Sequence, residues 1–252
     1  MFCGEDYLDI YKRINGKLQQ AKRLEGFNLL KADDREILQL GKFLSQQEIG
    51  LILNAQHFIF NIFEFDKIPF KLSVRKETVE WRLKKVFQEN IGNYIHEYFL
   101  LNRKSVLSVL FSRKVMERIE YMADLMGKDF IDIGNSTVEM MNQILSRQKW
   151  NLLKTFPDIL VEIDRDLFVI VAQNRSVPFF LRKFRCPDYA RNTQTVIKNI
   201  DFLQSNYARK LKNYYIVSND PDNLLEVIDR ELQKRDLAKW SDGKISHCFW
   251  LK

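Results

Sequence analysis

The chain has 252 residues, of which 46% are hydrophobic and 29% are charged, and it contains only 9 glycines and 5 prolines. This composition excludes collagen-like sequence, low-complexity sequence and bulk disorder, and the length predicts one domain or a core with a smaller appendage. Forty Lys and Arg residues against 33 Asp and Glu residues give a net charge of +7. Such an excess favours a polyanionic partner without establishing one.

The chain shows no sign of secretion, of a disulfide framework or of a zinc site. Its three cysteines, Cys3, Cys186 and Cys248, are widely spaced and form no CxxC pair. The N-terminus lacks the long apolar stretch of a signal peptide, and the apolar runs 58–63 and 167–172 are too short to cross a bilayer. We therefore expect a soluble intracellular protein, cytoplasmic or nuclear, with no membrane partner.

The N-terminal two-thirds of the chain is predicted to be mostly helical. Apolar residues at roughly helical spacing predict helices over 6–24, 33–41 and 45–54. The second follows Asp33, a good N-cap, and the third opens with Ser45 and Glu48 at the spacing of a capping box. Residues 55–72 are rich in Phe and Ile and are either a short hairpin or a buried connector. Further helices are predicted over 76–101, 114–127 and 136–155.

The periodicity changes after Pro157. Residues 158–164 alternate between apolar and polar, and residues 167–172 are continuously apolar, which predicts a β-hairpin. A basic loop, a helix over 189–211, a strand over 213–218 and a helix over 222–236 follow. We therefore predict an α/β core over 76–252, preceded by a helical region over 1–75 that serves DNA recognition or dimerisation.

The hairpin resembles part of a known enzyme superfamily. The sequence Phe156-Pro157-Asp158 enters the first strand, and the second strand ends in Gln173-Asn174. A Pro-Asp dipeptide followed by strand, strand, helix and strand is similar to the PD-(D/E)xK nucleases, which include type II restriction endonucleases. The resemblance implies a restriction-endonuclease-like core, a small mixed sheet flanked by helices. It also implies Mg²⁺-dependent hydrolysis of phosphodiesters in duplex DNA, often by a homodimer.

The resemblance makes Asp158 the metal ligand, but the usual acid of the second strand is absent. If the turn is the two residues Arg165 and Asp166, Asp158 faces Gln173 and Val171 occupies the acid position. If the loop has three residues, Asp158 instead shares a face with Ala172 and Asn174.

Other acids are candidates for the missing carboxylate. In the register with a two-residue turn, Glu162 lies on the same face as Asp158 and would be the second metal ligand. Glu80, on the long preceding helix, would supply another carboxylate. Gln173 would stand in for the catalytic lysine and orient the attacking water.

Basic residues after the hairpin are the predicted nucleic-acid contacts. Arginine and lysine bind phosphates and base edges, and interleaved aromatic rings stack on bases or pack the loop. The predicted contacts are Asn174, Arg175, Arg182, Lys183, Arg185, Arg209 and Lys210.

A second resemblance points to a different class of DNA-binding protein. Residues 73–87 read Ser-Val-Arg-Lys-Glu-Thr-Val-Glu-Trp-Arg-Leu-Lys-Lys-Val-Phe and look like the recognition helix of LuxR-type helix-turn-helix regulators. Segments 35–38 and 44–49 look like the first helices of that motif. However, residues 55–72 intervene where the family has a tight turn. If this match holds, Arg75, Lys76, Arg82 and Lys85 would face DNA.

The leading hypothesis is therefore a restriction-type, DNA-binding endonuclease. Three alternatives stay open at this point. The chain could be a catalytically inactive nuclease-like protein that binds nucleic acid or a protein partner. It could be a helix-turn-helix transcription regulator, or a helical interaction module with incidental strands.

Overall fold

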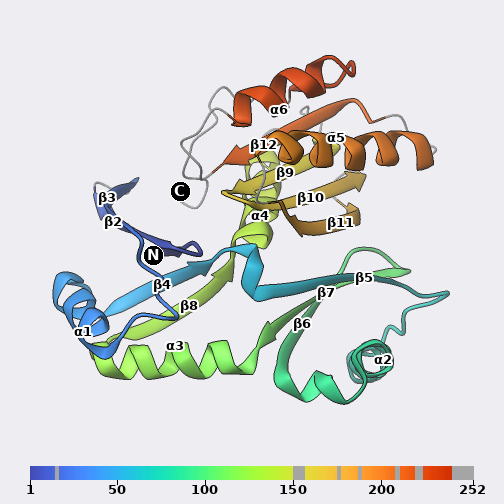
Figure 1. Ribbon diagram of the computed structural model, residues 1–252. Coiled ribbons are helices and arrows are strands. Elements are labelled where there is room, and N and C mark those ends of the chain that lie inside the picture. The colour runs from blue at the N-terminus through green and yellow to red at the C-terminus, as the bar shows by residue number, and fades with distance from the viewer. Residues whose placement is uncertain are drawn as a thin grey trace. The chain divides into compact units, whose positions relative to one another are not determined.

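The computed structural model of the protein describes residues 1–14, 17–149, 157–174, 177–186, 189–207, 211–218 and 224–239 (Figure 1). The chain forms two compact units. The first comprises Met1–Lys12 and Gln20–Asn135, and the second comprises Arg13–Gln19 and Ser136–Lys252. No helix within the described ranges combines the length and the apolar character that a membrane span requires.

The first unit is built on a five-stranded sheet in the order β3-β2-β1-β4-β8. Its strands are β1 (Phe2–Cys3), β2 (Tyr7–Ile14), β3 (Lys17–Glu25), β4 (Glu48–Leu53) and β8 (Asp129–Asn135). Strand β1 is antiparallel to β2 and parallel to β4, and β4 is parallel to β8. The sheet is therefore a hairpin extended by parallel strands, and parallel strands need crossover connections.

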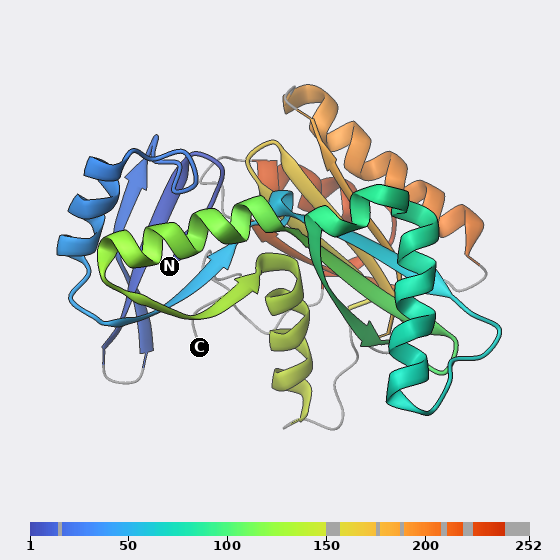
Figure 2. The same cartoon turned by 90° about the horizontal axis from the view of Figure 1, so that it is seen from below.

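Two helices of this unit, α1 (Asp34–Phe43) and α3 (Arg113–Met126), pack side by side (Figure 2). Helix α1 begins with a complete capping box, in which the side chains of Asp33 and Glu36 each accept the other's backbone N–H at 2.9 Å. Helix α3 ends at Gly127, whose φ of 63° is left-handed. The sequence predicted both helices, and these caps explain why they could be predicted.

A subdomain is inserted between β4 and α3. It consists of the 3₁₀ turn η1 (Ala55–His57), β5 (Phe58–Glu64), α2 (Leu72–Phe87), the 3₁₀ segment η2 (Gln88–Asn93), β6 (Tyr94–Leu100) and β7 (Ser105–Ser112). Its three strands form an antiparallel sheet with β7 in the centre. Val79 and Leu83 of α2 pack against Phe63, Val106 and Leu110, so α2 covers one face of this sheet. We call residues 55–112 the inserted subdomain.

The second unit has a sheet in the order β11-β10-β9-β12-β13. Its elements are α4 (Ser136–Lys149), β9 (Ile159–Asp164), β10 (Leu167–Asn174), β11 (Val177–Arg185), α5 (Tyr189–Asn206), β12 (Asn213–Ser218), α6 (Leu224–Gln233) and β13 (Ala238–Lys239). Strand β10 is antiparallel to both neighbours, whereas β9, β12 and β13 run parallel. Helices α5 and α6 cover one face of the sheet, where Val196, Ile200 and Ile228 pack against β9 and β10 (Figure 1).

The two units share one topology. Each has three consecutive strands, a helix, a fourth strand, a helix and a fifth strand, in the same spatial order. The antiparallel pair β1–β2 corresponds to β9–β10, and the parallel pairs β1–β4 and β4–β8 correspond to β9–β12 and β12–β13. The inserted subdomain and α4 are additions to this common plan.

The predicted helical N-terminal region is wrong. The segment predicted as a helix over 6–24 contains β2 and β3, and the one over 45–54 contains β4. Residues Tyr7, Leu8, Asp9 and Ile10 are all buried, because β2 is covered on both faces. A strand buried on both faces loses its alternation, so its apolar residues also match a helical spacing.

The long helix predicted over 76–101 is also wrong in its second half. Helix α2 stops at Gln88, where φ is 51°, and the chain then forms η2 and the strand β6. The side chains of β6 alternate between half-buried and exposed along most of its length. The basic loop predicted after the hairpin is mostly the strand β11. By contrast, the predicted hairpin, the strand over 213–218 and the two C-terminal helices are confirmed as β9–β10, β12, α5 and α6.

Candidate functional site

Asp158 lies where the chain enters β9, and its carboxylate is used to join two segments of the second unit. Its Oδ2 accepts the backbone N–H groups of Lys212 at 2.8 Å and Asn213 at 3.3 Å. In return, its own backbone N–H donates to Oδ1 of Asn213 at 2.7 Å. Only 7% of the residue is exposed. This arrangement fixes the entry of β9 beside the start of β12.

Gln173 lies opposite Asp158, as the register with a two-residue turn predicts. Leu167 pairs with Asp164 across Arg165 and Asp166, and the backbone N–H of Gln173 donates to the carbonyl of Asp158 at 2.9 Å. The side-chain amide of Gln173 donates to the carbonyl of Pro157 at 2.8 Å. The backbone N–H and the side-chain amide of Gln173 therefore both stabilise the end of the hairpin.

Glu162 is buried in the middle of β9, with 2% of the residue exposed. Its Oε2 accepts a hydrogen bond from the hydroxyl of Thr137, in the first turn of α4. Burial raises the pKa of Glu162 to about 7; the hydroxyls of Ser136 and Thr137 oppose this rise, and the charge of Asp164 adds to it. The carboxyl group therefore anchors the start of α4 to the sheet and exchanges its proton near neutrality.

Glu80 belongs to the first unit, on α2. Its Oε1 lies 3.9 Å from Nζ of Lys76 and 3.9 Å from Nε2 of His96. Within the described ranges, no three His, Cys, Asp or Glu side chains are placed to hold a metal ion. The Mg²⁺ cofactor is implied only by the nuclease resemblance.

The basic residues predicted to bind nucleic acid make contacts within the second unit where the structure describes them. Arg182 donates to Oδ1 of Asn199 on α5 at 2.7 Å, and Arg185 lies 3.3 Å from Asp166. Burial, followed by the nearby charge of Arg185, lowers the pKa of Lys183. Asn174 ends β10 and is exposed. The remaining three, Arg175, Arg209 and Lys210, lie outside the described residues.

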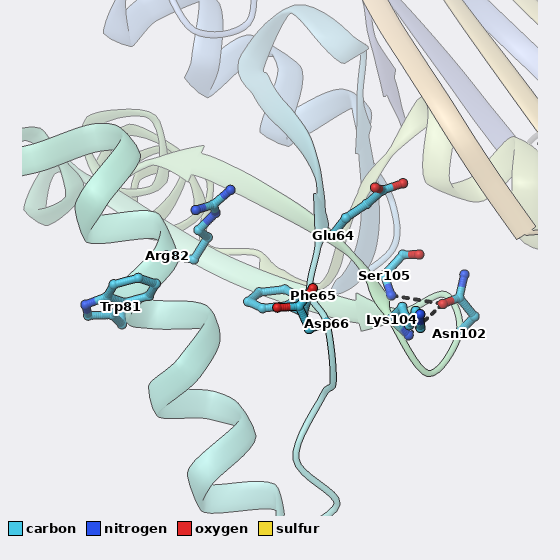
Figure 3. A pocket seen from close by; sticks show the side chains of 8 residues that line it. All are labelled: Glu64, Phe65, Asp66, Trp81, Arg82, Asn102, Lys104 and Ser105. Carbon is cyan, nitrogen blue, oxygen red and sulfur yellow. Dashed lines mark hydrogen bonds between the residues drawn. The ribbon is translucent and has the colours of Figure 1, made fainter.

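A pocket of about 570 Å³ lies in the inserted subdomain, between α2 and the ends of its strands (Figure 3). Trp81 and Arg82 line it from α2. Glu64, Phe65 and Asp66 come from the end of β5 and the loop that follows, and Asn102, Lys104 and Ser105 from the turn between β6 and β7. Oδ1 of Asn102 accepts the backbone N–H groups of Lys104 at 2.7 Å and Ser105 at 2.9 Å, which fixes that turn.

The pocket carries both signs of charge. Among the described residues, none of Glu64, Asp66, Arg82 and Lys104 forms an ion pair. Trp81 is 58% exposed, and Nζ of Lys85 lies 5.3 Å from the centre of its ring. An exposed tryptophan beside uncompensated charges is typical of a protein-binding surface. Sequence reasoning singled out this helix because of Trp81 and the neighbouring cations, but it interpreted the helix as a candidate DNA-recognition helix.

The helix-turn-helix interpretation is wrong. Residues 35–38 do lie on a helix, α1, but residues 48 and 49 begin the strand β4. Helix α2 is separated from both by η1 and β5 and packs on the inserted sheet. The motif requires consecutive helices joined by a turn of a few residues, so the sequence match is one of composition only.

Comparisons with known proteins come from structure rather than sequence. No family model and no curated protein sequence matches the chain. A structure described as the PilM–PilN type IV pilus biogenesis complex superposes with a TM-score of 0.69 at 10% identity, over 95% of this chain and 87% of that one. A Bacteroides thetaiotaomicron protein with an actin-like ATPase fold gives a TM-score of 0.60 at 12% identity, over 98% and 91%. The cytoplasmic domain of EpsL, an inner-membrane component of the Vibrio cholerae type II secretion system, gives 0.50 at 10% identity, over 91% and 92%.

These likenesses correct the nuclease prediction, including its DNA partner. The predicted core was a small sheet over 76–252, whereas the observed fold extends over both units and includes the strands of residues 1–53. None of the three matched structures is described as a nuclease or a DNA-binding protein. The second unit resembled a nuclease in sequence because a Pro-Asp dipeptide enters a hairpin, and a helix and a strand come later in the chain. The structural comparisons show that the chain has the actin-like ATPase fold.

Proposed function

We propose that the protein is an assembly factor of a pilus-type or secretion-type machine, in which the actin-like fold holds a partner protein. The observation that supports this most directly is the likeness to the PilM–PilN complex, which extends over 95% of this chain. The likeness to EpsL, a component of a type II secretion system, points in the same direction.

The residues present do not fit a nucleotide, although the fold is named after ATPases. Proteins cradle phosphates with glycine-rich loops, because a bare Cα lets backbone N–H groups approach the anion closely. The chain has nine glycines, and residues 135–242, which make up most of the second unit, contain none. The turn between β9 and β10 is formed by Arg165 and Asp166, between two strands without glycine.

The one glycine in the turn between β1 and β2 serves packing instead. A Cβ added to Gly4 would lie 2.1 Å from Cε1 of Tyr7, whose ring is fully buried. The guanidinium of Arg23 covers the same ring at 4.1 Å. Gly4 is therefore closed off by Tyr7, and its neighbours in the turn are the carboxylates Glu5 and Asp6. These residues favour a scaffold over a nucleotide hydrolase.

The proposed function is tested by deleting the gene in the organism that encodes it. We expect loss of surface pili or of secreted substrate, measured by electron microscopy and by assay of the culture medium, and restoration by the wild-type gene. Pili and secretion at normal levels in the deletion strain would overturn the proposal.

A further inference from the structure

We propose that the pocket of the inserted subdomain binds an acidic, apolar segment of a partner protein, with an Asp or Glu of that segment entering between α2 and the strand ends. This inference rests on the proposed function in that it assigns the partner-binding site of the scaffold. Four observations carry it: an unsatisfied arginine, a local excess of positive charge, an exposed apolar strip, and two carboxylates on the pocket wall.

Arg82 is the first observation. It is half-buried, its Nε is fully covered, and that atom has no hydrogen-bond acceptor in the described part of the chain. The guanidinium lies over the ring of Phe63, with its central carbon 6.0 Å from the ring centre. Arginine stays charged at every physiological pH, and a covered donor without an acceptor is costly. A carboxylate that enters the pocket would satisfy Arg82 with paired, charge-assisted hydrogen bonds.

The charge around the pocket is the second observation. Residues 66–87 contain seven Lys or Arg residues and three acids, an excess of four positive charges out of the +7 of the whole chain. Lys104 adds a cation on the opposite side of the pocket. The segment that contains α2 therefore carries a local excess of positive charge, which steers an acidic partner toward the pocket.

The third observation is an apolar strip along the outward face of α2. Val74 and Trp81, seven residues apart, share this face and are 41% and 58% exposed. Phe70, just before the helix, is 82% exposed, and its carbonyl accepts a hydrogen bond from Nη2 of Arg75 at 2.8 Å. The backbone that carries Phe70 is therefore held in place, which reduces the entropy lost when a partner covers the ring.

The carboxylates distinguish a protein segment from a membrane surface. Exposed aromatic residues beside lysines also suit an anionic bilayer. However, Arg82 is half-buried in the wall of the pocket, so an inserted side chain reaches its guanidinium more readily than a flat layer of headgroups does. Glu64 and Asp66 line the same pocket and would repel anionic lipid. In a peptide, a basic residue near the acid pairs with them, so a protein segment satisfies both signs of charge.

The test selects ligands without assuming the partner. A displayed library of random linear peptides is panned against the intact protein, and enriched peptides are synthesised and their affinities measured by fluorescence anisotropy. We expect enrichment of Asp or Glu next to Leu, Ile or Phe, with a Lys or Arg close by that pairs with Glu64 and Asp66. Arg82→Met and Trp81→Ala should each weaken binding by about tenfold or more. Arg35→Met, which removes an exposed arginine from α1 of the same unit, should leave the affinity unchanged.

Thermal denaturation of each variant checks that it is folded, and the exposed Trp81 provides a test even if Arg82→Met unfolds. A consensus without acids, or equal enrichment on Arg82→Met, would overturn the inference. So would Trp81-dependent binding to phosphatidylglycerol vesicles without enrichment of acidic peptides, because it would assign the surface to a membrane.

The same variants separate the site from the function. If the deletion strain loses pili or secretion and the Trp81→Ala gene restores them fully, the docking site is wrong and the scaffold role stands. If the deletion has no effect but acidic peptides bind in an Arg82-dependent manner, the site stands and the proposed function is wrong.

Discussion

Asp158 illustrates how one residue can support two readings from sequence alone. A Pro-Asp dipeptide at the entry of a strand signals a metal ligand in a nuclease. An aspartate in that position also accepts backbone N–H groups of a neighbouring loop, as it does here from Lys212 and Asn213. Sequence left two registers open for Asp158, and the structure shows the one in which it faces Gln173. Sequence could not predict the loop over Asp158, because that contact joins segments far apart in the chain.

Asp158→Ala should therefore lower stability. Two partly buried backbone N–H groups lose their acceptor, and we expect a loss of about 1–3 kcal/mol in the free energy of unfolding, measured by urea denaturation. The matched control is Asp166→Ala, in the same hairpin, which removes a partly exposed ion pair with Arg185 and should cost less than about 1 kcal/mol. Equal losses for the two variants would contradict this role of Asp158.

Glu162 should make stability depend on pH. Burial raises its pKa from the usual 4.5 to about 7, so the folded chain keeps a proton that the unfolded chain releases near 4.5. Between these values the folded state binds more protons, and stability falls as pH rises. Glu162→Gln, which keeps an acceptor for Thr137, should remove this slope. The variant should exceed wild type by on the order of 3 kcal/mol at about pH 8, and show little advantage near pH 4.

Urea denaturation across this pH range measures the effect of Glu162→Gln. The control is Glu226→Gln, an exposed position on α6, which should leave the pH profile as in wild type. A Glu162→Gln variant whose stability follows the wild-type pH profile would show that Glu162 does not hold a proton in the folded state.

At the scale of elements, the turn of the first hairpin requires a residue without a Cβ atom, which is Gly4. The ring of Tyr7 occupies the space beside Gly4, so Gly4→Ala forces the ring or the turn to move. We expect a loss of about 1–3 kcal/mol, measured by thermal or urea denaturation. Gly50→Ala in β4 of the same sheet meets no atom within 4 Å and should be close to neutral. A tolerated Gly4→Ala would show that the turn adapts and leaves room beside the glycine.

Elements with local signals could be predicted, and elements defined by pairing could not. The capping box of Asp33 and Glu36 and the left-handed Gly127 mark the ends of their helices in sequence. The strands β2 and β4 carry no such marks, and their burial depends on distant partners. Ser45 and Glu48 have the spacing of a capping box, yet Ile49, Leu51 and Leu53 alternate as a strand. Pairing of β4 with β1 and β8 decides between these two patterns.

At the scale of the whole molecule, the repeated topology explains the wrong family assignment. The order of elements after Pro157 was predicted almost correctly, except that a loop was predicted where the structure has the strand β11. Adding β11 makes a meander of three strands, and the same meander in the first unit was hidden in a predicted helix. The fold can be recognised only when both meanders are identified. Neither meander can be identified without knowing which strands pair.

At the scale of the whole molecule, the scaffold role predicts that the protein does not bind nucleotide. A ligand that binds only the folded state raises the melting temperature, and the rise grows with the logarithm of the ligand concentration above its Kd. Because the residues present do not fit phosphates, about 1 mM ATP with Mg²⁺ should leave the melting temperature unchanged, and calorimetric titration should show no saturable heat. A saturable, Mg²⁺-dependent shift would show that the chain binds nucleotide although residues 135–242 contain no glycine.

The inserted subdomain also has a consequence for how the chain folds during synthesis. Strands β9, β10 and β11 pair with their immediate neighbours in sequence, whereas β4 pairs with β8 only after the whole inserted subdomain and α3 have been made. Closing so long a loop is slow, and pairings between distant segments lower folding rates. Until β8 has been synthesised, β4 is therefore an unpaired edge of the incomplete first sheet. Such an edge can pair with another nascent chain. A chaperone that covers β4 at this stage of synthesis would protect the chain from such pairing.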